Sequence, residues 1–150
     1  MVSKSKSPED TSALGKEFAM NIKAGDIIGL DGELGSGKTQ FVKGIGEYFD
    51  VKDIINSPTF ILVNEYIGTN PENGKTLKIN HFDLYRIENL GELSVIGFDD
   101  YLNDDSITVI EWCRLAEEYL KMEIKKVKFN YGESENEREI EFFANVNIGK

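Results

Sequence analysis

Two short runs of apolar residues have the composition expected of buried β-strands. Ile27 to Leu30 form the first run, and Ser106 to Ile110 form the second. Both are too short for a typical helix, and a strand covered on both faces does not need to alternate with polar residues. We therefore predict two buried strands at these positions.

Apolar residues at helical spacing predict the main helices. A helix is expected over 7–24, where Ser-Pro followed by two acidic residues forms a start signal. Leu14, Phe18 and Ile22 would form its apolar stripe. Further helices are expected over 39–49 and from 113 to 120, and short helices within 88–102.

Two pairs of segments rich in β-forming residues flank turn-like stretches and predict hairpins. The first pair is 60–66 and 76–82, and the second is 122–129 and 138–146. Together these elements predict an α/β fold with a mixed sheet flanked by helices, parallel around the first buried strand and antiparallel elsewhere. Without a linker or internal repeat, residues 1–150 are expected to form one P-loop NTPase-like domain, with residues 1–6 disordered.

The charge balance limits the classes of partner. The net charge of −10 disfavours broad binding to nucleic acid, which needs an excess of Lys and Arg. No apolar run approaches the roughly 20 residues of a membrane span. The charged start, 1–7, has no hydrophobic segment behind it, so we expect no secretory signal and a cytoplasmic protein.

The single cysteine, Cys113, cannot form an internal disulfide, which fits a reducing compartment. No histidine lies near it in the sequence to act as a base. We expect it to be a small packing residue and not a nucleophile.

Residues 32–39 read GELGSGKT and match the P-loop pattern G-x-x-x-x-G-K-[ST]. Its glycines allow backbone angles that bring successive N–H groups to one phosphate, at the start of a helix. Lys38 would reach the β- and γ-phosphates, and the Thr39 hydroxyl would bind Mg²⁺. The predicted strand before the motif and the helix after it favour a nucleoside triphosphate site over an ordinary glycine-rich turn. The residues expected to contact the nucleotide are Glu33, Leu34, Gly35, Ser36, Gly37, Lys38, Thr39 and Gln40.

Glu111 follows the second buried strand and should lie at the same sheet edge as the P-loop. There it would hold Mg²⁺, directly or through water, or it would orient or deprotonate the attacking water. A solvent-facing carboxylate at the end of a strand is the structural alternative. The P-loop beside it favours the functional interpretation.

Asp83 and Thr59 are weaker candidates when each is taken alone. His81, Asp83 and Arg86 could be a solvated strand end with a local Asp–Arg pair, and Thr59 could be a turn residue. The position of Thr59 favours a functional role. It follows the P-loop helix, where nucleotide switches place a hydroxyl that senses γ-phosphate and Mg²⁺.

Four blocks together resemble the TsaE family, small bacterial P-loop ATPases of tRNA threonylcarbamoyladenosine synthesis. The blocks are GELGSGKT at 32–39, SPTF at 57–60, HFDLYR at 81–86 and IEW at 110–112. They occur in the family's order with similar spacing, and the resemblance covers Thr11 to about Tyr119. Members often have proline after the Glu-Trp pair, whereas this chain has Cys113.

The resemblance implies ATP and Mg²⁺ as cofactors and assigns roles to single residues. Glu111 would be a second Mg²⁺ contact after Thr39, and Asp83 would act near the metal or the attacking water. Thr59 would lie on a mobile switch-like loop. Trp112 would sit beside the nucleotide, and Arg138 and the segment 7–11 would approach the adenine end.

By the same resemblance, ATP hydrolysis would drive a partner pair, TsaD and TsaB, and the chain would meet tRNA only through that complex. Hydrolysis by the isolated chain should be slow, because its only arginines are Arg86, Arg114 and Arg138 and none is an obvious arginine finger. A small-molecule kinase is a second hypothesis, disfavoured by these scattered arginines. A GTPase switch is a third, and the missing Asn-Lys-x-Asp signature favours ATP.

Overall fold

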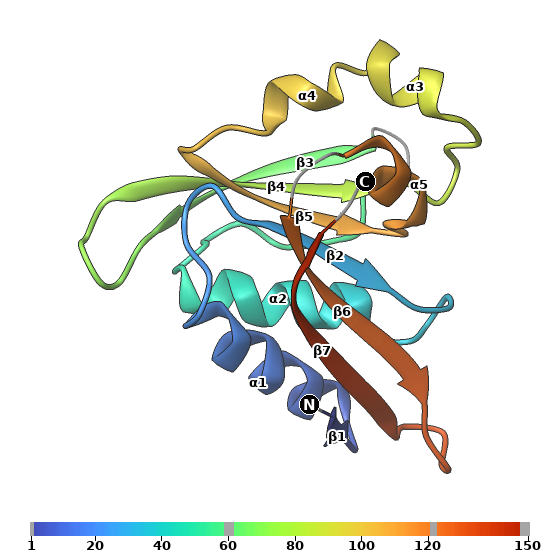
Figure 1. Ribbon diagram of the computed structural model, residues 1–150. Helices are drawn as coiled ribbons and strands as arrows, with labels where there is room; N and C mark the ends of the chain where they lie inside the picture. Colours follow the sequence, from blue (N-terminus) through green and yellow to red (C-terminus); the bar gives the residue numbers. More distant parts are fainter. Residues whose placement is uncertain (1, 59–61, 121–122, 148–150) are drawn as a thin grey trace.

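The computed structural model describes residues 2–58, 62–120 and 123–147. In chain order its elements are β1 (Val2–Ser5), α1 (Pro8–Ala19), β2 (Ile27–Asp31), α2 (Lys38–Tyr48), β3 (Val63–Thr69), β4 (Thr76–Asp83), α3 (Leu90–Val95), α4 (Phe98–Tyr101), β5 (Ser106–Glu111), α5 (Arg114–Tyr119), β6 (Glu123–Tyr131) and β7 (Arg138–Asn147). The strands form one sheet in the order β1-β7-β6-β2-β5-β4-β3 (Figure 1). The predicted α/β class with a mixed sheet is confirmed.

The centre of the sheet is parallel. β2 lies between β5 and β6 and pairs in parallel with both, and β4 continues the parallel arrangement beside β5. Every residue of β2 and β5 is buried, so the two strands predicted from apolar runs are confirmed. Their carboxyl ends meet at one edge, where the P-loop and Glu111 follow.

Both predicted hairpins are confirmed, β3 with β4 and β6 with β7. β3 begins at Val63 and runs to Thr69, into the segment that we expected to be a loop. Its glycine at position 68 lies against the backbone of Phe49, with no room for a Cβ. Glycine therefore marks a close approach at this position and not a turn.

The prediction of disorder over residues 1–6 is wrong for residues 2–5. These residues form β1, which pairs antiparallel with β7, and the Ser5 hydroxyl lies 2.7 Å from the Thr11 hydroxyl. The strand has the sequence VSKS, without apolar alternation, and its residues pair through the backbone with the edge of β7. Such a strand leaves no hydrophobic signal in the sequence.

Helices cover both faces of the sheet. α1 and α2 lie on one face, and α3, α4 and α5 lie on the other (Figure 1). Each face has its own apolar core, with Phe41 and Ile45 in the first and Leu93 and Phe98 in the second. Among the described residues, no helix has the length and apolarity needed to cross a membrane.

α1 ends at Ala19, five residues before its expected end at Ala24. The next N–H groups bond to carbonyls three residues back, as from Ile22 to Ala19, so the chain tightens into turns. Ile22 is still buried, which explains why its spacing suggested a longer helix. At the start of α1, Ser7 caps the N–H of Asp10, as the start signal predicted.

α1 and α2 pack closely because each places a glycine at the contact. A Cβ at Gly15 would lie 2.2 Å from the Phe41 carbonyl oxygen. A Cβ at Gly44 would lie 1.9 Å from the Ser12 carbonyl oxygen. Backbone cannot move aside as a flexible side chain does, so these positions fix the distance between the two helices.

We expect Gly44→Ala to lower the free energy of unfolding by roughly 2–3 kcal/mol, because the added methyl group forces the helices apart. Urea unfolding followed by circular dichroism measures the change. Lys43→Ala, an exposed neighbour on the same helix, is the control and should change stability by less than about 0.5 kcal/mol. Equal stability of Gly44→Ala and the wild type would contradict the packing described here.

Cys113 is fully buried in the second core, as predicted for a packing residue. Its Sγ donates to Glu117 Oε1 at 3.4 Å. Burial raises the pKa of the Cys113 thiol, and the carboxylate of Glu117 raises it further. The thiol is therefore protonated at neutral pH and shielded from reagents.

A thiol reagent such as dithionitrobenzoate should modify Cys113 at least about 100-fold more slowly in the native protein than in urea, because the reaction requires opening of the core. Absorbance at the dye's visible band follows the reaction. Cys113→Ser defines the background signal. Rapid labelling of the folded protein would show that the thiol is accessible and would reopen its role as a nucleophile.

Candidate active site

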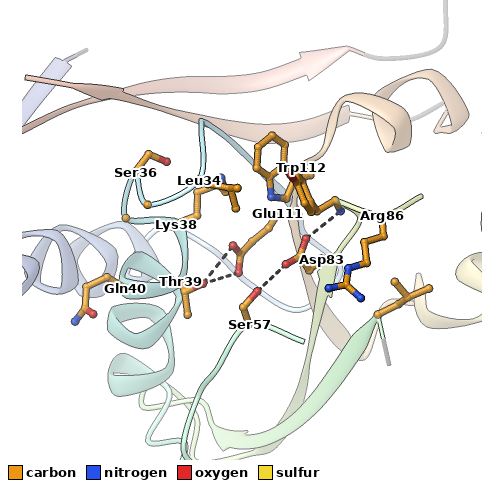
Figure 2. Close-up of a pocket in the computed structure, with 14 residues that line it drawn as sticks. Leu34, Ser36, Lys38, Thr39, Gln40, Ser57, Asp83, Arg86, Glu111 and Trp112 are labelled. Carbon is orange, nitrogen blue, oxygen red and sulfur yellow. Dashed lines mark hydrogen bonds between the residues drawn. The ribbon is translucent and has the colours of Figure 1, made fainter. Parts of the chain in front are cut away.

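A cavity of about 530 Å³ lies at the carboxyl edge of the parallel strands. The P-loop forms one wall, and side chains that follow β4 and β5 form the opposite wall (Figure 2). Glu111 ends β5, and Asp83 ends β4 directly beside it in the parallel register. The cavity is thus where the topology brings the candidate residues together.

The P-loop follows β2 and leads directly into α2. Gly35 and Gly37 have φ values of 74° and 105°, in the region that favours glycine. No side chain caps α2 at Gly37, and the helical ladder begins with the bond from the Phe41 N–H to the Gly37 carbonyl. The N–H groups of residues 38–40 therefore lie at the open helix end, where an anion is stabilised.

Lys38 is held inside the P-loop. Its Nζ donates to the carbonyl oxygens of Gly32 and Glu33, the latter at 3.1 Å, and lies 4.1 Å from the centre of the Trp112 ring. Burial lowers the pKa of Lys38, while the carboxylates of Glu111 and Asp83 oppose that shift. These carboxylates favour the charged form of an amine that the surrounding protein partly desolvates.

The Thr39 hydroxyl and the Glu111 carboxylate face each other across the cavity (Figure 2). Thr39 Oγ1 lies 3.1 Å from Glu111 Oε2 and 3.3 Å from Oε1, and donates to the carboxylate. Glu111 is only 3% exposed, so it is not the solvent-facing carboxylate of the alternative interpretation. A buried carboxylate requires such partners, because desolvation of an unpaired charge is costly.

Asp83 lies beside this pair and is held by two donors. The Ser57 hydroxyl donates to Oδ2 at 2.7 Å, and the Tyr85 N–H donates to Oδ1 at 3.0 Å. Arg86 lines the same cavity. Ser57 thus connects the segment after α2 to the carboxylate that ends β4.

The oxygen atoms of Thr39, Asp83 and Glu111 form the kind of donor set that Mg²⁺ prefers. Among the described residues, no group of three or more His, Cys, Asp or Glu side chains is arranged to hold a metal by itself. Mg²⁺ is usually held by one or two carboxylates together with phosphate oxygens and water, and this cavity has two carboxylates, those of Asp83 and Glu111, in its wall. The residues present therefore fit a magnesium ion that arrives with a phosphate.

Trp112 closes the cavity on the side of Lys38. Its φ of 58° is unusual for a residue with a Cβ, and it places the indole directly after Glu111. The ring lies 4.8 Å from the ring of Tyr85 and forms part of the cavity wall. Trp112 was expected beside the nucleotide, and it lines the same cavity as the P-loop.

Not all expected residues meet in this cavity. Arg138 donates to the Gly35 carbonyl at 3.0 Å and lies over the Tyr131 ring, 4.9 Å from its centre. With Ser7 and Thr11 it borders a second cavity of about 130 Å³ on the outer side of the P-loop. The cavity of about 530 Å³ is lined by residues Leu34 to Gln40 of the P-loop segment. Thr59, which was expected on a switch-like loop, falls outside the described residues.

His81 is buried, although we considered it as part of a solvated strand end. Its side chain is fully buried, and its Nε2 lies 2.6 Å from Glu111 Oε2. Its Nδ1 lies 3.3 Å from the hydroxyl of Tyr66, which the sequence did not single out. Alternation along β4 could have placed His81 on the same face as Asp83, but only strand pairing brings in Tyr66.

Comparison with known families gives a match over residues 5–140 to the family described as "Threonylcarbamoyl adenosine biosynthesis protein TsaE". Two curated relatives carry the name "tRNA threonylcarbamoyladenosine biosynthesis protein TsaE". The protein of Bacillus subtilis (strain 168) is 38% identical over 137 residues, covering 91% of this chain and 81% of the relative. That of Haemophilus influenzae is 35% identical over 150 residues, covering 95% and 90%.

A solved structure supports the same assignment. "Crystal structure of Bacillus subtilus YdiB" superposes with a TM-score of 0.76 and 32% sequence identity. The match covers 97% of this chain and 86% of that chain. The similarity therefore extends over the whole fold, including both predicted hairpins.

Proposed function

The chain belongs to the TsaE family, and from this premise we propose that it is a magnesium-dependent ATPase that serves threonylcarbamoylation of tRNA. One observation carries the proposal. The P-loop residues Lys38 and Thr39 and the carboxylates of Asp83 and Glu111 line the same cavity, with Thr39 hydrogen-bonded to Glu111. A P-loop Lys and Ser/Thr together with an acidic residue of a neighbouring strand is the set by which P-loop NTPases hold the phosphates and Mg²⁺.

The phosphate groups would bind at the start of α2. N–H groups of the loop and the first helical turn supply hydrogen bonds, and Lys38 supplies a positive charge. The bonds from Lys38 to Gly32 and Glu33 already hold its ammonium inside the loop, so little side-chain entropy would be lost on binding. Trp112 would limit access of water on the side of Lys38.

Mg²⁺ would be held by Thr39 Oγ1 and by Glu111 and Asp83, directly or through water. When bound, the ion would offset charge on the phosphoryl oxygens. The carboxylates of Asp83 and Glu111 would repel a phosphate bound at the P-loop, and Lys38 supplies one positive charge against them. We therefore expect the reaction to depend on Mg²⁺.

Hydrolysis needs a group that orients the attacking water. Asp83 is suited to this role, because Ser57 and Tyr85 hold its carboxylate in place in the wall of the cavity. Glu111 is the alternative, since one carboxylate can contact both the metal and the water. A water so oriented would attack the γ-phosphorus and release ADP.

ATP hydrolysis would drive the TsaD–TsaB pair, which would hold the tRNA. The net charge of −10 suits a protein that binds another protein and not the nucleic acid itself. The chain has three arginines, and Arg86 alone lines the large cavity. A partner that adds a cation near the γ-phosphate would therefore accelerate a slow intrinsic reaction.

Mg-ATP hydrolysis should be weak for the isolated protein and should rise at least about 10-fold with TsaD, TsaB and tRNA. Lys38→Ala and Glu111→Gln should each lower the stimulated rate by about 100-fold or more, because each removes a contact to the transferring phosphate or its metal. Release of phosphate measures the rate. Lys43→Ala and Glu118→Ala, exposed positions of matching charge, serve as controls and should retain full activity.

Other outcomes would assign other functions. ADP formation that rises with a metabolite and not with the partner proteins would indicate a small-molecule kinase. Displacement of ATP by GTP at equal concentration would indicate a guanine-nucleotide switch. Full turnover by Glu111→Gln would exclude the acidic wall of the cavity from the reaction.

A further inference from the structure

We propose that Tyr66 and His81 are positioning residues that fix the Glu111 carboxylate and tie its orientation to the backbone of Asn56. This inference rests on the proposed function, because Glu111 is a magnesium contact only in that function. The three side chains form one hydrogen-bonded series, from Tyr66 to His81 to Glu111.

The series is buried along its length. The His81 and Glu111 side chains are 0% and 4% exposed, and Tyr66 is 4% exposed. The contact between His81 Nε2 and Glu111 Oε2, at 2.6 Å, is shorter than either bond from Thr39 to the same carboxylate. His81 therefore holds Oε2 most tightly and leaves Oε1 with the weaker contact.

The donors and acceptors of the series follow from chemistry. An ionised carboxylate only accepts, so the His81 Nε2 must carry a hydrogen and donate it to Glu111. The Tyr66 hydroxyl lies 3.3 Å from the other ring nitrogen, Nδ1, and completes the series.

The Tyr66 hydroxyl also bonds to the main chain. It donates to the carbonyl oxygen of Asn56 at 3.1 Å, and its oxygen lies 3.3 Å from His81 Nδ1. Asn64 Nδ2 also donates to the Asn56 carbonyl, at 3.0 Å. Asn56 directly precedes Ser57, whose hydroxyl holds Asp83. The segment 56–57 therefore contacts both acidic residues of the site, one directly and one through Tyr66 and His81.

This arrangement gives His81 the role that outer partners of metal ligands usually have. Such partners orient a ligand without touching the metal, and their loss typically lowers metal affinity 10- to 100-fold. A histidine with only a packing role would need no bond to Glu111. Its neighbour Asn80 shows the contrast, since it is equally buried on the opposite face of β4 and bonds to Tyr101 and Ser106.

The test measures magnesium-dependent nucleotide binding without hydrolysis. Trp112 is the sole tryptophan of the sequence and lines the cavity, so its fluorescence can report binding of ADP as MgCl₂ is added. We expect His81→Leu to raise the Mg²⁺ concentration at half-saturation by about 10-fold or more. Tyr66→Phe, which removes one hydroxyl, should raise it about 3- to 5-fold. Binding of ADP without Mg²⁺ should stay within about 2-fold of the wild type, since neither residue touches the P-loop.

Conservative and control variants separate positioning from folding. His81→Gln keeps a side-chain N–H that can reach Glu111, so it should recover much of the affinity lost in His81→Leu. Asn80→Leu is the matched control, which should lower the melting temperature and leave the Mg²⁺ dependence unchanged. Tyr66→Phe changes a single atom and keeps the test valid even where a histidine variant fails to fold.

Two results would overturn the inference in distinguishable ways. A wild-type protein without Mg²⁺-dependent nucleotide binding would overturn the proposed function, and the inference with it. Wild-type binding that depends on Mg²⁺, with the same dependence in Tyr66→Phe and in the folded histidine variants, would overturn the inference alone.

Discussion

The parallel pairing of β2 with β5 is the constraint on which the site depends. Its register places Leu30 opposite Glu111, so the strand that leads into the P-loop ends beside the carboxylate. β4 adds Asp83 by the same rule, since it pairs in parallel with β5. Residues separated by more than seventy positions, such as Thr39 and Glu111, meet because of this pairing and not because of local sequence. A one-residue shift would turn Glu111 to the other face of the sheet.

The same pairing brings charged side chains close together, and their neighbours stabilise each charge by hydrogen bonds. Two carboxylates and one ammonium group lie at a sheet edge with little solvent. Lys38 bonds to backbone carbonyls of its own loop, Asp83 accepts from Ser57 and Tyr85, and Glu111 accepts from Thr39 and His81. Each charge thus has hydrogen-bond partners within the protein, which hold these side chains in place around the cavity.

Much of the fold could be predicted because its signals are local. The apolar runs at β2 and β5, the cap at Ser7 and the P-loop each depend on a few adjacent residues. The elements that could not be predicted depend on partners distant in sequence. β1 pairs with the edge of β7, and after Ala19 the N–H groups bond to carbonyls three residues back, so α1 ends before the apolar spacing does.

The residues of the site also fall into two groups, those that local sequence predicts and those that depend on distant partners. Lys38, Thr39, Asp83 and Glu111 could be named from motifs, and the structure brings them to one cavity. His81 was misjudged because a lone histidine in a strand carries no signal of burial. Tyr66 was missed because its link to Glu111 exists only through strand pairing.

The outer side of the P-loop is braced by the last hairpin. Tyr131 donates to the Leu34 carbonyl, Arg138 donates to the Gly35 carbonyl, and Arg138 is itself the residue of β7 that pairs with Ser5 of β1. Hydrogen bonds therefore link β1 to the hairpin of β6 and β7, and link this hairpin to the P-loop. A displacement of β1 would therefore pass through β7 and Arg138 to the backbone of Gly35 in the P-loop.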